Sequence, residues 1–480
     1  MKICLLVEGS YPHVTGGVST WVQMLIKNLT EHQFIIFSVG AEEKYRGKFK
    51  YMLPENVMEI HEIFIDEMLK GGGSYGKSYR FTREAAANLK YLITGEKVDW
   101  DYIFNLFAEK KIKNEMDFFM SISFFDILRD AYIEKFSSIP FTEFFWTVRS
   151  MLVPLFFLLK KKLPIADIYH SAATGYAGIL GAMAKFLYKK PFIVTEHGIY
   201  SREREEEIIK SSWAKGSFKD MWIKFFYNIC GGVYRYADKV MTLFEKNKEI
   251  EIELGCPPQK LEVIPNGIEI NSFKEVTVRV PDGYINIATI TRVVPIKDIK
   301  TMIQSFKHVK NFIKNARFFI FGPYDEDEEY YRECLLLIKR LGLRDIEFTG
   351  KVDVKKYIND MDILVLTSIS EGQPFVILEG FAVKKPFVTT DVGGCSELIY
   401  GRNDDFGRAG IVVPVMDVEK ISKAVIKLAS NPKLREKMGE SGYKRVLAFY
   451  TSEKCVESYR RVYNSFMNNK NNLMAESAVG

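Results

Sequence analysis

Two glutamates stand eight positions apart in the stretch Thr367 to Phe381, TSISEGQPFVILEGF. Glu371 lies in the loop after an apolar run, and Glu379 lies inside a helix that should begin near Pro374. At about 1.5 Å of rise per helical residue, the two carboxylates should be roughly 10 Å apart. This spacing suits a long ligand that carries hydroxyl groups at both ends.

The backbone between these glutamates predicts a phosphate site. The N–H groups of Gln373, Phe375 and Val376 point out of the expected helix N-terminus, where a phosphate binds well. Sugar hydroxyls at one end, a diphosphate in the middle and ribose hydroxyls at the other end describe a nucleotide sugar. Two solvated glutamates would show the same spacing, but the position directly after a buried strand favours a binding site.

Two cations follow the first expected strand of the second half. Arg292 and Lys297 stand in an R-x4-K spacing within the loop TRVVPIK. The spacing lets both side chains converge on one anion, and the arginine can bind it bidentately. Cations there would stabilise the charge that develops on a departing diphosphate. A surface pair near a helix start explains the spacing equally well.

The first half contributes a glycine pair and a histidine. Gly16 and Gly17 open the first long helix, so the backbone can approach a ligand closely, although a plain tight turn is an equal explanation. His197 follows the expected strand Pro191 to Thr195, at the carboxyl edge of a sheet, where ligands usually bind. A catalytic and a structural role for this histidine are about evenly supported.

Other motifs carry less weight. The stretch GGGSYGKS, Gly71 to Ser78, satisfies the P-loop pattern, but no strand runs directly into it, so a flexible loop is favoured. The histidines show no H-x3-H spacing and the cysteines do not cluster, so we predict no metal. Three D-x-D triplets are expected by chance in a chain this rich in acids.

Composition limits the class of protein. At 480 residues the chain predicts two domains or more. Net charge is +6, and the basic residues are spread out, which suits a local anionic ligand better than nucleic acid. Six single cysteines favour a reducing cytoplasm. No apolar run should span a bilayer, since the strongest, Met151 to Leu159, contains Pro154 and ends at three lysines.

Short apolar runs alternate with helical patterns twice along the chain, which predicts two parallel α/β sheets. We expect domains at residues 1–280 and 281–448, a helix at 449–468 and a disordered tail at 469–480. Residues 66–163 form a helical insertion, with a linker near 273–283. The expected strands are Lys2 to Glu8, Phe34 to Val39, Ile168 to His170, Pro191 to Thr195, Lys239 to Leu243, Ile285 to Ile290, Arg317 to Phe321, Ile346 to Phe348, Ile363 to Leu366, Pro386 to Thr390 and Ala409 to Val413.

The motifs in this order resemble the retaining glycosyltransferases of family four. The resemblance covers almost the whole chain and rests on the glycine pair, the stretch IPNGI at Ile264 to Ile268, the R-x4-K pair and the E-x7-E pair. Four longer strings are similar to the PelF-type enzymes of Pel exopolysaccharide synthesis: LVEGSYPHVTGGVSTWV, VTEHGIYSREREEEI, SEGQPFVILEGFAV and DVGGCSELIYG.

The resemblance implies the GT-B fold, an α/β fold with two doubly wound Rossmann-like domains facing across a cleft. It implies a retaining, metal-independent hexosyltransferase with a UDP-sugar donor, UDP-glucose or an N-acetylhexosamine relative, and no cofactor. The acceptor would be a growing exopolysaccharide. Membrane subunits of a synthase and export complex would be partners, at the inner face of the cell membrane. A noncatalytic nucleotide-sugar-binding subunit and a P-loop phosphotransferase remain the alternatives.

The resemblance also assigns roles to residues. Arg292 and Lys297 would contact the diphosphate and stabilise it as it leaves. His197 would position the donor sugar, and it would come from the opposite domain together with the loop at Gly17. No protein nucleophile is implied, because the leaving phosphate is thought to assist the acceptor hydroxyl on the same face of the sugar.

Further donor contacts are implied in the second domain. Glu371, with the backbone of Gly372 and Gln373, would bind the donor sugar, and Glu379 would bind the ribose. Gly350 to Val352, after the expected strand Ile346 to Phe348, would contact the base. The last helix, around Tyr459 to Phe466, would cross back onto the first domain.

Overall fold

The computed structural model describes residues 1–70, 73, 76–273, 282–402 and 404–477. The chain divides into two compact units, Met1–Val263 with Arg460–Gly480, and Ile264–Tyr459. The division precedes the expected boundary at residue 280 because the intervening segment packs on the second unit. Ile268 N donates to Tyr450 O at 2.9 Å, and Ile268 and Phe273 belong to an apolar cluster of that unit. Residues 274–281 of the expected linker lie outside the described residues.

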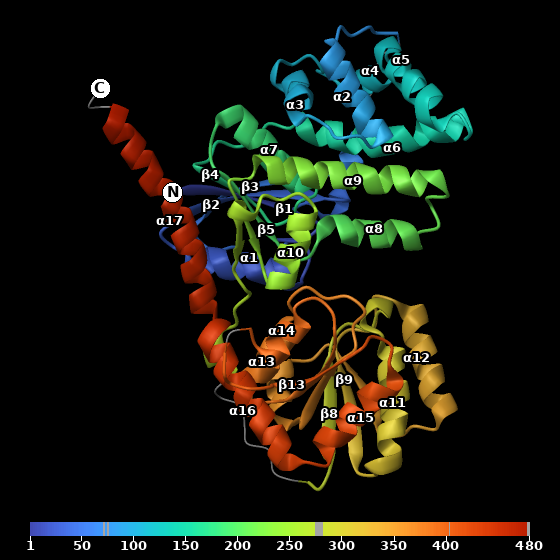
Figure 1. Cartoon of the computed structure of the whole chain (residues 1–480), viewed down its shortest axis with the longest axis vertical. Coiled ribbons are helices and arrows are strands. Elements are labelled where there is room, and N and C mark those ends of the chain that lie inside the picture. The colour runs from blue at the N-terminus through green and yellow to red at the C-terminus, as the bar shows by residue number, and fades with distance from the viewer. Residues whose placement is uncertain (71–72, 74–75, 274–281, 403, 478–480) are drawn as a thin grey trace. The chain divides into compact units, whose positions relative to one another are not determined.

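The first unit is built on a parallel sheet (Figure 1). Its apolar strands are buried, as expected for a parallel sheet. Among the described residues the strand order is β3-β2-β1-β4-β5-β6-β7, so the order reverses between β1 and β4. The strands are β1 (Lys2–Glu8), β2 (Gln33–Gly40), β3 (Val57–Phe64), β4 (Ile168–Ser171), β5 (Phe192–Glu196), β6 (Lys239–Thr242) and β7 (Leu261–Val263).

Helices follow the strands of this unit. They are α1 (Gly17–Asn28), α7 (Tyr176–Tyr188), α8 (Tyr200–Lys210), α9 (Ser217–Tyr236) and α10 (Glu245–Glu253). Short helical turns lie at η1 (Glu43–Tyr45), η2 (Ile65–Lys70), η4 (Pro258–Lys260) and η5 (Ile270–Phe273), the last of which belongs to the second unit.

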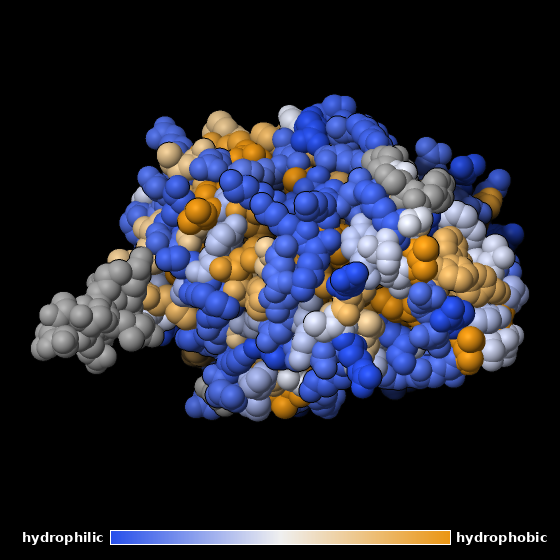
Figure 2. All heavy atoms as spheres, turned by 90° about the horizontal axis from the view of Figure 1, so that it is seen from above, coloured by the Kyte–Doolittle hydropathy of each residue, from blue (hydrophilic) through white to orange (hydrophobic). Residues whose placement is uncertain are grey.

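Between β3 and β4 the chain forms a group of helices, in the segment where the sequence predicts a helical insertion. They are α2 (Arg83–Thr94), α3 (Trp100–Ala108), α4 (Glu115–Phe119), α5 (Ile122–Ala131), η3 (Tyr132–Phe136) and α6 (Phe141–Leu159). Buried aromatic rings hold the group together, such as Phe118 and Phe156 with ring centroids 5.4 Å apart. Hydrophobic side chains, including Ile122, Phe125 and Trp146, are also exposed, and Figure 2 shows hydrophobic side chains scattered among hydrophilic ones on the face seen from above.

One element of this insertion differs from the sequence-based expectation about membrane spans. Among the described residues, α6 is the one helix long and apolar enough to cross a bilayer by length and composition. The apolar run seen in the sequence begins at Met151, whereas the helix begins ten residues earlier, at Phe141. Every residue from Met151 to Leu159 is buried within the first unit. This burial is typical of the core helix of a folded domain.

The second unit repeats the same architecture. Its described strands form a parallel sheet in the order β10-β9-β8-β11-β12-β13, which reverses between β8 and β11. The strands are β8 (Ile285–Ile290), β9 (Ala316–Phe321), β10 (Ile346–Gly350), β11 (Ile363–Leu366), β12 (Phe387–Thr390) and β13 (Gly410–Val413). The helices and turns are η6 (Pro295–Lys297), α11 (Ile299–Phe312), α12 (Glu328–Leu341), η7 (Val354–Lys356), η8 (Ile358–Asp360), α13 (Phe375–Ala382), α14 (Cys395–Tyr400), α15 (Val418–Ala429) and α16 (Pro432–Phe449).

The last helix, α17 (Ser452–Ser477), begins in the second unit and is grouped with the first unit from Arg460 onward. In the first unit, Arg460 Nε bonds Glu31 Oε1 at 2.7 Å, and the hydroxyl of Tyr463 lies 2.7 Å from His170 Nδ1. The helix is described through Ser477, and the expected disorder of residues 469–480 stays a prediction. No glycine or proline interrupts this stretch, so nothing in it forces the helix to end.

The two predicted parallel α/β sheets are thus confirmed. Every expected strand is present, with both ends within two residues of the predicted bounds. Strands β3 and β7 were not predicted. All six cysteines are buried and free, as singly placed cysteines suggest.

Candidate functional site

Both units place their candidate residues at the point where the strand order reverses. In open parallel sheets, ligands bind beyond the carboxyl ends of the strands at this point. In the second unit, the loop after β8 contains Arg292 and Lys297, and the loop after β11 contains Glu371. These are the loops that the sequence predicts to carry the chemistry.

The structure brings Lys297 and Glu371 into direct contact. The ammonium Nζ lies 2.5 Å from Glu371 Oε1, and the side chains are only 17% and 11% exposed. The same carboxylate oxygen accepts a hydrogen bond from Ser368 Oγ at 2.5 Å. A half-buried, charge-assisted contact of this kind fixes both groups far better than an exposed ion pair would.

Hydroxyl groups hold the two loops against each other. Thr367 Oγ1 lies 3.0 Å from Lys297 O and 3.1 Å from Asp298 O. Thr390 Oγ1, at the end of β12, donates to Ser368 O at 2.6 Å. All of these hydroxyl side chains are buried, so their bonds to backbone carbonyls satisfy groups that water does not reach. The position of Lys297 relative to Glu371 is therefore set by the ends of three strands.

Gly393 supports the same loop from the other side. Its φ is +51°, and a Cβ atom built there would lie 2.0 Å from Glu371 O and 2.5 Å from Gly372 O. Gly394 N donates to Gly372 O at 2.9 Å. Only glycine combines this φ with so close an approach of two backbones.

The loop then leads into α13 in the predicted way. Pro374 precedes the helix, and no side chain caps its N-terminus. Gln373 is buried, and its Oε1 accepts a hydrogen bond from Asn266 N at 2.6 Å, which ties IPNGI to this loop. Burial raises the pKa of Glu379, inside the helix, and the nearby ammonium of Lys355 opposes that rise.

Arg292 and Lys297 do not share one partner. Arg292 Nη1 pairs with Glu326 Oε1 at 2.5 Å, and both side chains are about half exposed. The convergence of the two cations predicted from their spacing is therefore absent from the described structure, because each cation has its own carboxylate. Gly350, at the end of β10, has a φ of +72° and accepts a bond from Gly322 N at 3.0 Å, and Val352 packs on the apolar cluster nearby.

The first unit has a cavity of about 480 Å³ at its own reversal point, beyond the ends of β1 and β4. His197 lies in its lining, as does Val18, next to the glycine pair that opens α1. Gly16 precedes α1 without a side-chain cap. The lining also includes Glu8, Ser10, Tyr176, Tyr200, Glu203 and Arg204.

Two carboxylates occupy helix N-termini beside this cavity. Glu8 Oε2 accepts a bond from Ala177 N, in the first turn of α7, at 3.1 Å, and its Oε1 accepts one from Tyr200 Oη at 2.7 Å. Glu196 Oε1 accepts a bond from Tyr200 N, the first residue of α8, at 3.0 Å. Each carboxylate satisfies N–H groups that a helix leaves unpaired.

His197 is a neutral imidazole near neutral pH. Its ring packs edge-on against Trp21 with centroids 4.6 Å apart. Burial lowers the pKa of His197 to about 3. Burial, followed by the charge of His197, lowers the pKa of His170 to about 3 as well. His197 can therefore exchange hydrogen bonds with a ligand without adding a positive charge.

The low pKa of His197 gives a testable pH dependence of stability. Between pH 6.5 and pH 3, roughly, the folded state binds fewer protons here than the unfolded chain, so stability is lost as the pH falls. We expect His197→Gln to reduce the slope of unfolding free energy against pH by up to about 1.4 kcal/mol per pH unit. Urea unfolding at several pH values measures it. An unchanged slope in His197→Gln would contradict the expectation.

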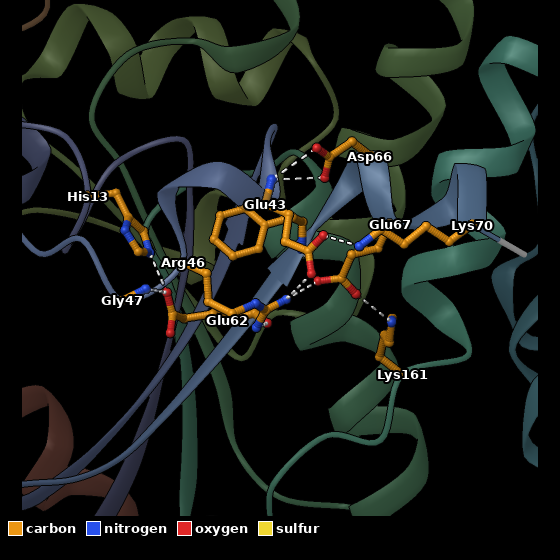
Figure 3. Close-up of polar contacts among 10 residues, drawn as sticks. His13, Glu43, Arg46, Gly47, Glu62, Asp66, Glu67, Lys70 and Lys161 are labelled. Carbon is orange, nitrogen blue, oxygen red and sulfur yellow. Dashed lines mark hydrogen bonds and ion pairs between the residues drawn. The ribbon is translucent and has the colours of Figure 1, made fainter.

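Figure 3 shows an ionic network around Glu43, Asp66 and Glu67. These residues are close in sequence to Gly40, Ala41 and Ile65, which form one wall of the cavity. Both carboxylate oxygens of Asp66 accept bonds from Glu43 N at 3.0 Å, and Asp66 N donates to Ala41 O at 3.1 Å. The remaining contacts join Arg46 to Glu67, Lys70 to Glu43, Lys161 to Glu67, and His13 and Gly47 to Glu62. Since Lys161 follows α6, the network also ties the insertion to this wall.

The P-loop-like stretch lacks the expected context. Part of it, residues 71–72 and 74–75, lies outside the described residues. Strand β3 ends at Phe64, seven residues before the stretch begins, and η2 intervenes. Lys77 forms an ion pair with Asp117, and the next helix, α2, begins only at Arg83. The described part therefore does not have the strand, loop and helix of a P-loop.

Comparison with known families agrees with this architecture. Residues 1–259, more than half of the chain, match the family described as "Domain of unknown function (DUF3492)", and residues 273–445 match "Glycosyl transferases group 1". The chain belongs to the first family and carries the domain of the second, which makes it a glycosyltransferase of the GT-B type.

Individual relatives give the same picture. The chain is 25% identical over 335 residues, 66% of its length and 80% of the relative's, to the Escherichia coli UDP-Gal:alpha-D-GlcNAc-diphosphoundecaprenol alpha-1,3-galactosyltransferase. It is 26% identical over 337 residues, 66% and 83% of the two chains, to the Staphylococcus aureus capsular polysaccharide glycosyltransferase CapM. Anabaena HepE, solved with UDP and glucose, shares the fold with a TM-score of 0.61, 14% identity and coverage of 97% and 100%.

The sequence patterns did not predict several residues of the site. Glu8 ends β1 directly before Gly9, so the rule that singled out His197 at the carboxyl edge of a strand also applies to it. Ser368 follows β11 by two residues and could be found in the same way. The role of Gly393 depends on a backbone contact with a loop more than twenty residues away, which no local pattern indicates.

Proposed function

We propose that this protein is a retaining hexosyltransferase that moves a hexose or N-acetylhexosamine from a UDP-sugar to a growing exopolysaccharide. The observation that carries the proposal is the Lys297–Glu371 contact at the strand-order reversal of the second unit, directly before the uncapped N-terminus of α13. A cation, a carboxylate and a helix N-terminus supply the three kinds of group that a nucleotide sugar needs.

Each group has a chemical role in this proposal. The ammonium of Lys297 and the N-terminus of α13 stabilise the negative charge of the departing diphosphate. Glu371 accepts hydrogen bonds from hydroxyls of the donor sugar, and Glu379 accepts one from the ribose. His197, neutral at the pH of the cell, positions the donor sugar by hydrogen bonding. The backbone at Gly350 contacts the base.

The reaction needs no protein nucleophile. The bond between the anomeric carbon and the phosphate oxygen breaks, and the acceptor oxygen forms its bond on the same face of the sugar. The proton of the acceptor hydroxyl passes to the leaving phosphate oxygen, so UDP departs and the anomeric configuration is kept. Cations beside the diphosphate favour this route because they lower the energy of the charge that develops there.

The donor and acceptor classes rest on similarity. The E. coli relative is named for a UDP-Gal donor, and HepE has been solved with UDP and with UDP-glucose, which supports a UDP-sugar donor. The four strings that resemble PelF-type enzymes support a Pel-type polysaccharide as acceptor, and a place in the cytoplasm at the inner face of the cell membrane, beside membrane subunits of an export complex. The free, buried cysteines suit that compartment.

Replacing Arg292 with alanine tests the diphosphate site. We expect kcat/KM for UDP release to fall about tenfold, because the Arg292 guanidinium is more exposed than the Lys297 ammonium and contributes less to a charged transition state. The measurement is acceptor-dependent UDP release, with and without EDTA. Arg332→Ala removes a comparable exposed arginine, paired with Glu328, and serves as the control. Equal rates in the wild type and Arg292→Ala would exclude this role, and donor binding without turnover would indicate a noncatalytic subunit.

A further inference from the structure

The cavity of the first unit has a carboxylate of the chain itself, that of Glu8, at a helix N-terminus. A helix N-terminus normally attracts phosphate, and two helices, α7 and α8, begin beside this cavity. One N–H group in the first turn of each helix is already bound by a carboxyl group of the chain itself, Ala177 N by Glu8 and Tyr200 N by Glu196. Glu8 also lines the cavity, so its charge faces whatever enters. A phosphate group in the cavity would meet the carboxylate of Glu8 at a helix N-terminus, where a phosphate normally finds free N–H donors.

The cavity nevertheless carries polar groups that lack partners. Within the described residues, Ser10 Oγ, His197 Nε2 and Arg204 Nε are buried atoms with no hydrogen-bond partner, and all three residues line the cavity. Buried polar atoms are almost always paired in folded proteins. Three such atoms in the wall of one cavity indicate a ligand rich in hydrogen-bonding groups. The aromatic residue Tyr176 also belongs to the lining, and aromatic side chains are common in small-molecule sites.

Arg204 does not make the cavity a phosphate site. Its Nη1 is paired with Glu207 Oε2 at 2.8 Å, and its guanidinium carbon lies 5.1 Å from the centre of the Tyr200 ring. Glu203 also lines the cavity, so two carboxylates and one already paired guanidinium face the space. The cavity of the first unit therefore differs in charge from the second unit, where Lys297 stands before a helix without a cap.

We infer that the reacting end of the acceptor is an uncharged sugar bound in the first-unit cavity, and that Glu8 is the specificity-determining residue that rejects acceptors phosphorylated near that end. This inference rests on the proposed function, and it gives the chemical class of the second substrate, the acceptor. Glu8 accepts a hydrogen bond from a sugar hydroxyl, while Ser10 and Arg204 pair with the remaining hydroxyls, and His197 lies beside the acceptor with its hydrogen bond kept for the donor sugar. A phosphoryl group in the same position meets the carboxylate of Glu8.

The test compares matched acceptors on the full-length protein. Acceptor-dependent UDP release is measured with chitotriose and maltotriose, and with each trisaccharide phosphorylated at O6 of its non-reducing end, using the UDP-sugar that gives the highest rate. Binding of the same four compounds is followed by NMR of the carbon-13-labelled His197 ring. We expect the neutral trisaccharides to have at least tenfold higher kcat/KM than their phosphorylated forms, and we expect only the neutral ones to shift the His197 signal.

Glu8→Gln should lower the ratio of kcat/KM between neutral and phosphorylated acceptors at least fivefold. The kcat/KM of the phosphorylated acceptors should rise because the repelling charge is gone. The amide oxygen of the glutamine can still accept the hydrogen bond from the Tyr200 hydroxyl. Glu253→Gln removes the same charge from an exposed position outside the cavity and should leave the ratio unchanged. If folding of Glu8→Gln is impaired, Glu203→Gln tests the second carboxylate in the same way.

The outcomes separate the inference from the proposed function. The inference is overturned if the protein prefers phosphorylated acceptors and Arg204→Gln abolishes that preference. It is also overturned if neither Glu8→Gln nor Glu203→Gln changes the ratio of kcat/KM between neutral and phosphorylated acceptors. Binding of no acceptor, in a protein that binds UDP and is stabilised by it, also overturns the inference and leaves the donor half of the proposed function intact. Failure to bind any UDP-sugar contradicts the proposed function itself.

Discussion

Lys297→Ala is expected to lower kcat for UDP release by about 100-fold to 1,000-fold, the size of effect seen when one preorganised electrostatic group is removed from a transition state. The ammonium of Lys297 lies in a half-buried site, where its charge is less screened than in water. Its loss also leaves Glu371 with Ser368 as its remaining bonded partner among these loops. Steady-state kinetics at saturating donor measure the effect.

Lys300→Ala is the matched control for this substitution. Lys300 lies three residues further along the chain, is more exposed and pairs with Glu333 at 2.6 Å. Its removal should leave kcat within about twofold, because exposed ion pairs contribute little. A Lys297→Ala variant that keeps wild-type kcat while losing only donor affinity would show that the lysine binds ground state and transition state equally.

Gly393→Ala should reduce kcat/KM by about 100-fold, although Gly393 itself is not proposed to contact the ligand. A displacement of about 1 Å of a group that binds the substrate can lower the rate by that factor. The added Cβ would overlap Glu371 O at 2.0 Å, so the loop that holds the carboxylate must move. The positive φ adds about 1 kcal/mol of strain. Kinetics and a thermal unfolding curve on the same preparation separate the two effects.

Gly342→Ala isolates the strain from the displacement. Gly342 follows α12 with a φ of +63°, and a Cβ there would meet nothing within 4 Å. We expect a loss of stability of about 1 kcal/mol and unchanged kinetics. If Gly393→Ala behaves in the same way as Gly342→Ala, the contact between Gly393 and the Glu371 loop has no part in positioning the site.

The sequence predicted those parts of the fold that depend on local pattern. Buried parallel strands such as Ile285–Ile290 and Ile363–Leu366 are short apolar runs, so they were found at their exact bounds. Strand β3 was missed because Glu59, His61 and Glu62 interrupt its apolar residues. The domain division was placed at a loop-like composition near residue 280, whereas Ile268 and Asn266 already bond the second unit.

The same distinction applies to the candidate site. Lys297 and Glu371 could be named because both follow predicted strands that neighbour each other at the reversal point. Their direct contact, and the pairing of Arg292 with Glu326 instead, depend on side-chain directions that spacing does not fix. The carboxylate at the start of α7 comes from Glu8, 169 residues earlier in the chain, so no helix-capping pattern in the local sequence reveals it. Glu196 stands only four residues before Tyr200, so its place at the start of α8 is a local feature.

The burial of the six cysteines has a practical consequence for measuring conformational change in this protein. Burial raises the pKa of every one of these thiols, so little of the reactive thiolate form is present at neutral pH. A maleimide dye should therefore react first with a cysteine introduced at the surface, with no need to replace the native ones. One label on Glu253→Cys and another on Lys307→Cys would report the separation of the two units by energy transfer as donor and acceptor sugars are added.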